Sequence, residues 1–507
     1  MIALAAVASA VSVETITKTK DGRARMVFGE LGSVEKLTQY HAESFLAKDH
    51  VRALYKMVGG ESFTFRNSHH HEKIATFRFD QHLHGLEVYG GELNVHITPE
   101  TLAVHGLTGN VAPFDSTPTP DEALPLPRDM LDILVQKYGH DGLEVTQAAR
   151  LMYVIDDEDM PRLAYKMEVL SLKDDEYRQG SALKTLQPYD IYIDAITGRL
   201  IMDIPHFQAA LTRHVYDEKQ KTDLPGTLVR SEGQAATNDQ AVNDAYDFAG
   251  YCYNYYLNLY NRDSWDNMGS PLNSSVHYDV KYDNAFWNGN QMVYGDGDNI
   301  IFANFTSDLT VICHELSHAV TQSTSGLRYW AEPGALNEAF SDIMGSSSAV
   351  YTQDPKNNIP NPATAWIIGH NVTLINLNPT GCPDCPLGLR YMDNPALDGS
   401  SSDYYPDRYT GFQDERGVHW NSGIANLAYV LTVQGGVHPQ QKTNNFVQPA
   451  GIAQTEQVYY TGFTQYMTVT SQFADAKAAT VKAARVLGYS QAVQDSVSDA
   501  WTAVGVN

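Results

Sequence analysis

The sequence has few basic residues for its acidic content. Its 35 lysines and arginines stand against 60 aspartates and glutamates, which gives a formal net charge of −25 at pH 7. A protein that binds nucleic acid needs a basic face to neutralise phosphates, so this balance argues against a nucleic-acid partner. We expect the negative charge to lie on a solvated surface.

Long apolar runs are also missing. No uninterrupted apolar stretch approaches the roughly 20 residues that a membrane-spanning helix requires, so no membrane partner is expected. The chain has 507 residues, of which 43% are hydrophobic. That length predicts several globular domains, because single cores rarely grow so large.

The N-terminal segment, residues 1–24, has a short apolar run that ends in Ala8-Ser9-Ala10. Such small residues suit a signal-peptidase site, although the usual basic start is missing, since Met1 is followed at once by Ile2. We interpret the segment as a truncated secretory signal peptide. The alternative is an apolar N-terminus without that role.

Cysteine is scarce, with four residues in the chain. Cys382-Pro383-Asp384-Cys385 has neither a second pair nor nearby histidines for a zinc site, so a local disulfide in a secreted loop is the better interpretation. Cys252 and Cys313 are either buried thiols or a pair, and the spacing does not decide between them.

The pattern along the chain separates three regions. Ala75–Gln81 and Leu86–Ile97 alternate with a period of two around a His84-Gly85 turn, which predicts a β-hairpin. A proline-rich stretch over 113–127 follows as a linker. The region from about 128 to 205 is predicted as a small α+β unit, with a helix over 130–138 and strands over 151–155, 162–169 and 189–193. From about 212 onward, long amphipathic helices are predicted.

One pentapeptide carries metal chemistry, His314-Glu315-Leu316-Ser317-His318. Apolar residues at helical spacing surround it, so a helix is predicted, and histidines four apart on a helix share one face. Two neutral imidazoles suit zinc and leave it needing a third ligand. In the metzincin class, the third ligand would be a histidine at 324, and residue 321 would be glycine. This chain has Thr321 and Thr324, which excludes that class.

A carboxylate from a neighbouring helix is the alternative third ligand. The stretch GALNEAFSDIMG over 334–345 supplies Glu338 and, one turn later, Asp342. Its apolar positions indicate a helix with one polar face, long enough to return beside the histidine helix.

Several ordered stretches resemble the thermolysin-like zinc metalloendopeptidases. They cover the chain from 212 to its end and include NAFWNGNQMVYGDGD (284–298), HELSHAVT (314–321), SGLRYWAEPGALNEAFSDI (325–343), LRYMD (389–393) and RYTGFQDERGVHWNSGIAN (408–426). The resemblance implies an α+β fold with a two-lobed thermolysin-like catalytic domain. Its mixed β/α N-terminal lobe with the zinc helix would span 212–324, and its mainly helical C-terminal lobe 325–507.

The resemblance implies which residues form the zinc site. His314, His318 and Glu338 would bind one catalytic zinc ion, and Glu315 would be the general base that takes a proton from the attacking water and passes it to the leaving amine.

Other matched residues would assist the same reaction. Asn337 and Asp342 would orient the ligand histidines. Tyr329 and His419 would stabilise the negative oxygen that forms on the substrate, and Asp414 would hold His419.

Substrate contacts are implied in the same way. Asn284 and Ala285 would bind substrate backbone, and Arg390 would contact a substrate carbonyl. An apolar pocket would be lined by Phe302, Phe305, Val311, Val372 and Leu389. We therefore predict cleavage before bulky hydrophobic residues.

The first two regions resemble the family's propeptide. RFDQHLHGLEVYGGELNVHI is similar to its first segment and YDIYIDAITGRLI to the end of its second. The predicted domains are a fungalysin/thermolysin propeptide-like domain over 25–113 and a PepSY-like domain over 114–205. Such a propeptide assists folding and inhibits the enzyme, so a secreted zymogen is implied, with protein and peptide substrates. Phe207 and Leu211 are candidate cleavage positions.

This chain departs from the family pattern at the family's paired calcium site. Positions that are acidic in thermolysin are Thr310, Ala349, Ala365, Ile367 and His370 here. Because calcium prefers oxygen-rich cages, we expect this site to be absent, although calcium binding elsewhere stays open.

A second function class is a non-catalytic or permanently latent propeptide-type protein that binds or inhibits a protease. The presence of Glu315 and His419 argues against it, because an inert relative would be expected to have lost one of them.

Overall fold

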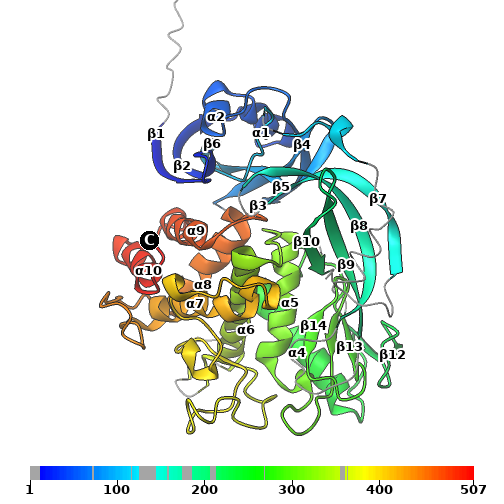
Figure 1. Ribbon diagram of the computed structural model, residues 1–507. Helices are drawn as coiled ribbons and strands as arrows, with labels where there is room; N and C mark the ends of the chain where they lie inside the picture. Colours follow the sequence, from blue (N-terminus) through cyan, green and yellow to red (C-terminus); the bar gives the residue numbers. More distant parts are fainter. Residues whose placement is uncertain are drawn as a thin grey trace, which may run out of the picture. The chain divides into compact units, whose positions relative to one another are not determined.

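The computed structural model describes residues 12–70, 73–115, 117–124, 144–156, 159–173, 185–205, 213–267, 269–353, 355, 360–361 and 364–507 (Figure 1). Two compact units are present: one comprises 1–172, 188–203 and 465–470, the other 173–187, 204–464 and 471–507. The signal-peptide motif at 8–10, the helix predicted over 130–138 and the cleavage candidates Phe207 and Leu211 lie outside the described residues.

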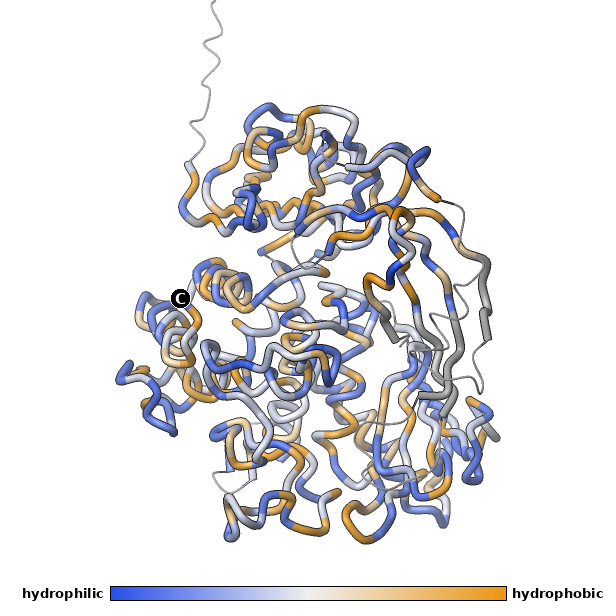
Figure 2. Tube along the Cα trace, viewed as in Figure 1, coloured by the Kyte–Doolittle hydropathy of each residue, from blue (hydrophilic) through white to orange (hydrophobic). Residues whose placement is uncertain are grey.

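The first unit is built on a sheet of ten strands within the described residues. The predicted hairpin is confirmed, because β4 and β5 pair antiparallel around the turn at 84–85. Figure 2 shows hydrophobic and hydrophilic residues mixed along the strands of this unit. The first six strands are β1 (Ser12–Lys18), β2 (Ala24–Ser33), β3 (Ser62–His70), β4 (Ala75–Leu83), β5 (Leu86–Thr98) and β6 (Ala103–Thr108).

The sheet continues through the second predicted region. β5 pairs parallel with β7, and the main path runs β1-β2-β6-β5-β7-β8-β9-β10. The three strands predicted in this region are confirmed within β7 (Glu144–Ile155), β8 (Pro161–Lys173) and β9 (Thr185–Asp194), and β10 (Leu200–Pro205) follows. Two short helices, α1 (Gln39–Leu46) and α2 (Asp49–Leu54), contribute buried side chains to the core of the first six strands.

The second unit begins with a five-stranded sheet whose order is β12-β11-β13-β15-β14. Its strands are β11 (His214–Asp217), β12 (Thr227–Ser231), β13 (Asn273–Val276), β14 (Ala285–Trp287) and β15 (Met292–Tyr294). β14 is an edge strand, since it pairs with β15 alone in this sheet. Among the described strands, one row of its backbone groups therefore has no partner.

Helices make up most of the rest of this unit, as predicted. They are α4 (Gln240–Tyr260), α5 (Leu309–Ser323), α6 (Ala331–Gln353), α7 (Asp414–Gln434), α8 (Ile452–Thr461), α9 (Phe473–Val486) and α10 (Gln491–Ala503). α5 begins where the Asp308 side chain accepts a hydrogen bond from the Thr310 backbone N–H, an N-cap that fixes the start of the helix. α5 and α6 lie side by side (Figure 1). Among the described residues, no helix has the length and apolar character needed to span a membrane.

The cysteines form two disulfides. Cys382 and Cys385 are bonded to each other, which confirms the predicted local bridge. Cys252 on α4 is bonded to Cys313 on α5, so the question left open by their spacing is answered in favour of a pair. Cys313 directly precedes His314, and the bond therefore ties the predicted metal helix to its neighbour.

Glu218, directly after β11, is a buried acid outside the predicted site. It is 3% exposed. Burial, together with repulsion by the carboxylates of Asp223 and Asp217, raises the pKa of Glu218 to about 7, although a hydrogen bond with the Ser275 hydroxyl opposes the rise. In the folded protein the carboxyl is therefore protonated at pH values well below 7.

Replacing Glu218 by glutamine is expected to stabilise the protein at pH 8 but not at pH 5. A carboxyl whose pKa rises on folding stabilises the fold below its unfolded value of about 4.5, and that contribution is lost as pH rises to about 7. The variant should gain about 1–2 kcal/mol relative to the parent between these two pH values, because water near the carboxyl screens part of the effect. Melting temperatures at both pH values, measured in a Glu315→Gln background to prevent self-digestion, test this. If the substitution changed the melting temperature equally at pH 5 and pH 8, the prediction would be wrong.

Candidate active site

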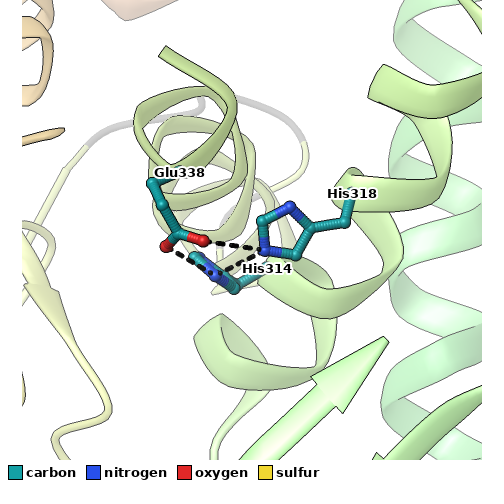
Figure 3. A group of neighbouring side chains, drawn as sticks. All are labelled: His314, His318 and Glu338. Atoms are coloured by element: carbon teal, nitrogen blue, oxygen red, sulfur yellow. Dashed lines mark hydrogen bonds and ion pairs between the residues drawn. The ribbon is translucent and has the colours of Figure 1, made fainter. Parts of the chain in front are cut away.

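Two helices bring three metal-binding side chains together. His314 and His318 lie one turn apart on α5, and Glu338 comes from α6 (Figure 3). The two Nε2 atoms are 3.1 Å apart, His314 Nε2 is 3.4 Å from Glu338 Oε2, and His318 Nε2 is 3.3 Å from Glu338 Oε1. Among the described residues this is the group of histidine, cysteine or acidic side chains whose ligand atoms lie close enough to hold one ion.

The other ring nitrogens of both histidines are held by polar neighbours. His314 Nδ1 lies 2.8 Å from Asp342 Oδ1. His318 Nδ1 lies 2.8 Å from Asn337 Oδ1, whose orientation is fixed because Asn337 Nδ2 donates to the Leu327 carbonyl. Since a carboxylate and an amide oxygen only accept, each Nδ1 carries the proton. Both Nε2 atoms therefore face each other and Glu338, where each can offer a lone pair to a cation.

This arrangement fits a tetrahedral cation. Ligand atoms bound at about 2.0 Å around a tetrahedral zinc lie about 3.3 Å from one another, close to the three separations given above. Glu338 is 0% exposed, and its Oε2 makes no hydrogen bond with the described residues. A buried carboxylate that faces two imidazole nitrogens is stabilised by a positive ion between them.

Glu315 lies one residue beyond the first histidine, on a different face of α5 from the ligand pair. It is 7% exposed, and burial raises its pKa, while the neighbouring histidines oppose the rise. An elevated pKa suits a carboxylate that must accept and then return a proton.

A second group borders the metal ligands. Tyr329 Oη lies 2.9 Å from His419 Nε2 and also donates to Glu338 Oε1. Asp414 accepts from His419 Nδ1 and from the His419 backbone N–H at 2.8 Å. Burial lowers the pKa of His419, but the carboxylates of Glu338 and Asp414 raise it to about 9, so the ring is positive at neutral pH.

Three protein-family models match this chain. The thermolysin metallopeptidase catalytic-domain model matches residues 200–322, the thermolysin metallopeptidase alpha-helical-domain model 325–506, and the fungalysin/thermolysin propeptide motif 71–101. A bacillolysin of Brevibacillus brevis is 32% identical over 85% of this chain and 82% of its own length. The chain belongs to the thermolysin family of metallopeptidases.

Two further similarities are with the thermolysin of Alicyclobacillus acidocaldarius subsp. acidocaldarius and with a solved structure. That thermolysin is 34% identical over 85% of this chain and 83% of its own length. The solved precursor of protealysin, a metalloproteinase from Serratia proteamaculans, is 35% identical, covers 59% of this chain and 90% of its own, and has a TM-score of 0.49.

Membership of the thermolysin family makes this chain a zinc metalloendopeptidase with a propeptide. The two-lobed α+β fold expected from the sequence is confirmed at the level of the family: the N-terminal part of the catalytic region mixes strands and helices, and the C-terminal part is helical.

The thermolysin-like site includes contacts that the motifs did not reveal. Arg390 donates two hydrogen bonds to Asp342, at 2.8 and 2.6 Å, and Asn426 donates a third at 2.9 Å. Although burial raises the pKa of Asp342, Arg390 and His314 hold it well below its usual range. Ser341 Oγ also lies 3.1 Å from His318 Nδ1. Asn426 is the last residue of the stretch 408–426 that resembles the family, and this position was the sequence feature that could have indicated its role.

The implied substrate-binding residues lie on several elements. Ala285 lies on the edge strand β14, and Asn284 directly precedes it. Phe302 and Phe305 have ring centres 5.7 Å apart, and Phe302 pairs with Thr373, next to Val372. Val311 is buried on α5, and Leu389 donates from its backbone to Ile368.

Replacing Tyr329 by phenylalanine is expected to lower kcat about 100-fold with little change in KM. The ring contacts remain, including the His318 ring at 6.0 Å between centres, but the hydroxyl at 2.9 Å from His419 is lost. If the hydroxyl acts mainly on charge that develops during the reaction, kcat falls and substrate binding does not. Steady-state kinetics on one peptide measure kcat and KM for both proteins. A change confined to KM would contradict the role of the Tyr329 hydroxyl in stabilising the developing charge.

Proposed function

We propose that this chain is a secreted zinc endopeptidase, made as a zymogen, that cleaves on the N-terminal side of bulky hydrophobic residues. The observation that carries the proposal is the convergence of His314, His318 and Glu338 beside Glu315. Three ligands leave a tetrahedral ion one open position, which is the arrangement of a catalytic rather than a structural zinc site.

His314, His318 and Glu338 would hold one zinc ion. When bound there, zinc supplies Lewis acidity, which lowers the pKa of water from 15.7 to about 7 and polarises a carbonyl. Asp342 and Asn337 support this by fixing the Nδ1 protons, so that both Nε2 lone pairs point to the metal position.

Glu315 would take the proton of the attacking water and later donate it to the leaving amine. Tyr329 and His419 would donate hydrogen bonds to the carbonyl oxygen of the cleaved bond as it becomes negative. The charge on His419 supports this role, and Asp414 holds the ring through Nδ1.

Substrate backbone would pair with the edge of the five-stranded sheet. The outer side of β14 is without a strand partner in that sheet, so an extended peptide can add there, with Asn284 and Ala285 beside it. Arg390 would contact a substrate carbonyl while anchored on Asp342. The residue after the cleaved bond would contact the apolar side chains of Phe302, Phe305, Val311, Val372 and Leu389.

Residues 25–113 and 114–205 would form the propeptide that inhibits the enzyme and assists its folding. The propeptide motif matched at 71–101 supports this. The proposed catalytic lobes span 212–324 and 325–507. Secretion, from a signal within 1–24, is supported by two disulfides, which persist in oxidising compartments.

The family's paired calcium site is proposed to be missing. Thr310 Oγ1 donates to the N-cap residue Asp308 and accepts from Gly369 N, while His370 Nδ1 lies 2.7 Å from the Leu387 carbonyl. Ala365 and Ile367 are buried apolar residues. These side chains give hydrogen bonds and packing where an oxygen-rich cage would be needed.

Incubation of the purified chain with casein and a leucine-containing peptide tests the proposal, with and without a zinc chelator. Mass spectrometry should find chelator-sensitive cleavage before Leu or Phe, and a cut near 200–212 in the chain itself. Bound zinc and a released propeptide without any peptide cleavage would contradict it. That outcome would favour the non-catalytic or permanently latent protein that binds or inhibits a protease.

A further inference from the structure

The sheet of the first unit has one apolar and one polar face. Alternate residues of β4 and β5 belong to its hydrophobic core, namely Ala75, Phe77, Phe79, Leu93, Val95 and Ile97. The residues that alternate with them point to the opposite face, because successive side chains of a strand point to opposite sides. They are polar and are here called the polar face: Thr76, Arg78, Glu92, Asn94 and His96.

The polar face is buried as completely as the apolar one. Each of its five residues is at most 1% exposed. An antiparallel sheet commonly leaves its polar face in water, so burial of this one requires a cover that satisfies its hydrogen bonds. Surfaces between parts that later separate are more polar than permanent ones, because both sides must be soluble afterwards. The composition of the face therefore suits a partner that is released.

A short segment from far along the sequence, residues 465–470, lies on the polar face. It belongs to the first unit, although the residues on either side of it belong to the second. Gln465 Oε1 accepts a hydrogen bond from the Thr76 hydroxyl at 3.0 Å. In the sequence, the segment lies between α8 and α9, within the proposed C-terminal catalytic lobe.

Two charged side chains of the sheet hold the backbone of this segment. Glu92 Oε1 accepts a hydrogen bond from the Val469 N–H at 2.8 Å, and the Arg25 guanidinium donates to the Thr470 carbonyl. Glu92 Oε2 also pairs with Arg66 at 2.6 Å, which fixes the carboxylate in place. Hydrogen bonds from ionised groups are about twice as strong as neutral ones, so these two contacts anchor the segment whatever its side chains are.

Tyr466 anchors the segment through its side chain. Its ring centre lies 5.2 Å from that of Phe28 and 4.8 Å from that of His96, both close to edge-to-face. Its hydroxyl lies 3.3 Å from His105 Nε2. Tyr466 is 0% exposed. A tyrosine with a buried ring and a polar partner for its hydroxyl is the kind of residue that dominates binding energy at interfaces.

We propose that the polar face is the surface through which the propeptide binds the catalytic part of the chain, and that residues 465–470 are its partner. The inference rests on the proposed function, which takes 25–113 as part of the propeptide. The attachment consists of side-chain and backbone contacts, so a cut near 200–212 leaves it intact. When the propeptide leaves, both the polar face and the threonines of the segment can be hydrated.

The test uses the full chain with Glu315→Gln, which prevents self-digestion, and with a recognition site for an added protease inserted within 206–212. The chain is immobilised through its C-terminus and cut, and loss of the N-terminal fragment is followed over time. The parent should retain the fragment. Tyr466→Ala should speed its loss about 30-fold or more, as for a buried anchor. Glu92→Gln should speed it about ten-fold, because the bond to the Val469 N–H loses its charge.

Asp80→Asn is the matched control for Glu92→Gln. Asp80 also pairs with Arg66, whose Nε donates to it at 2.8 Å, but it is not one of the residues described above as holding the segment. Loss of the fragment should stay within two-fold of the parent rate. Melting temperature and zinc content report whether each variant folds. Hydrogen exchange of the uncut chain gives a second measurement, in which the Val469 amide should exchange faster in Glu92→Gln than in Asp80→Asn.

Immediate loss of the fragment from the parent would overturn the proposal. So would rates within two-fold of the parent in both Tyr466→Ala and Glu92→Gln, or equal exchange of the Val469 amide in Glu92→Gln and Asp80→Asn. No step of the test uses peptidase activity. An active-site failure would therefore appear only in the peptide-cleavage assay described above, and failure of the attachment only here.

Discussion

Replacing Glu315 by glutamine is expected to reduce kcat/KM by about 10³- to 10⁴-fold while zinc remains bound. Glutamine has the same shape but can neither accept the proton of the attacking water nor return it to the amine. The residue is 7% exposed and its pKa is raised by burial, as suits a group that both accepts and returns a proton. Because Glu315 would carry out both proton transfers, the loss of rate should lie at the upper end of the range expected for one general acid–base group.

Zinc content per chain separates this effect from loss of the metal. The variant should bind one zinc ion and melt near the parent temperature, because the three proposed ligands are untouched. It should also accumulate as the uncut chain if the propeptide is removed by the enzyme itself. Activity within ten-fold of the parent would show that another group transfers the proton.

Replacing Glu338 by glutamine should abolish tight zinc binding, and with it the activity. The side chain is 0% exposed and supplies the negative charge in a group that otherwise offers two neutral imidazoles. Loss of a residue that only supports a ligand already costs 10- to 100-fold in metal affinity, so loss of a ligand charge should cost more than about 100-fold. Competition with a chromophoric chelator measures the affinity directly.

Glu332→Gln is the control for this variant, since Glu332 lies on the same helix and bonds Tyr405 and the Phe473 backbone N–H. It should keep the zinc affinity of the parent even if stability falls. Excess zinc should restore part of the activity of the Glu338 variant if metal loss is the cause. Full zinc occupancy in an inactive Glu338→Gln would contradict the assignment of Glu338 as a ligand.

The sequence predicted correctly those features whose geometry follows from the spacing of nearby residues. Histidines four apart on a helix must share a face, and the return of a second helix with Glu338 needed only a short turn, so the three side chains could be grouped from sequence. The hairpin of β4 and β5 followed from alternation and a glycine turn in the same way.

Long-range and strained features could not be predicted. The parallel pairing of β5 with β7 joins distant residues, and nothing local encodes its register. Cys252 and Cys313 are 61 positions apart in the sequence and lie on two different helices, so the sequence was equally compatible with two buried thiols. The left-handed turn at Asp414–Gly417 contains a single glycine, and ordinary propensities oppose such a conformation at Glu415 and Arg416.

The bond between Cys252 and Cys313 places the metal helix under the control of oxidative folding. Both cysteines are 0% exposed, so neither oxidant nor isomerase reaches them once the core has closed around α4 and α5. The bond must form while these helices are still accessible, before the final packing of the helix that carries His314 and His318. Chains that pack first would trap two thiols beside the metal position, and the order of these two events therefore decides which covalent form of the enzyme accumulates.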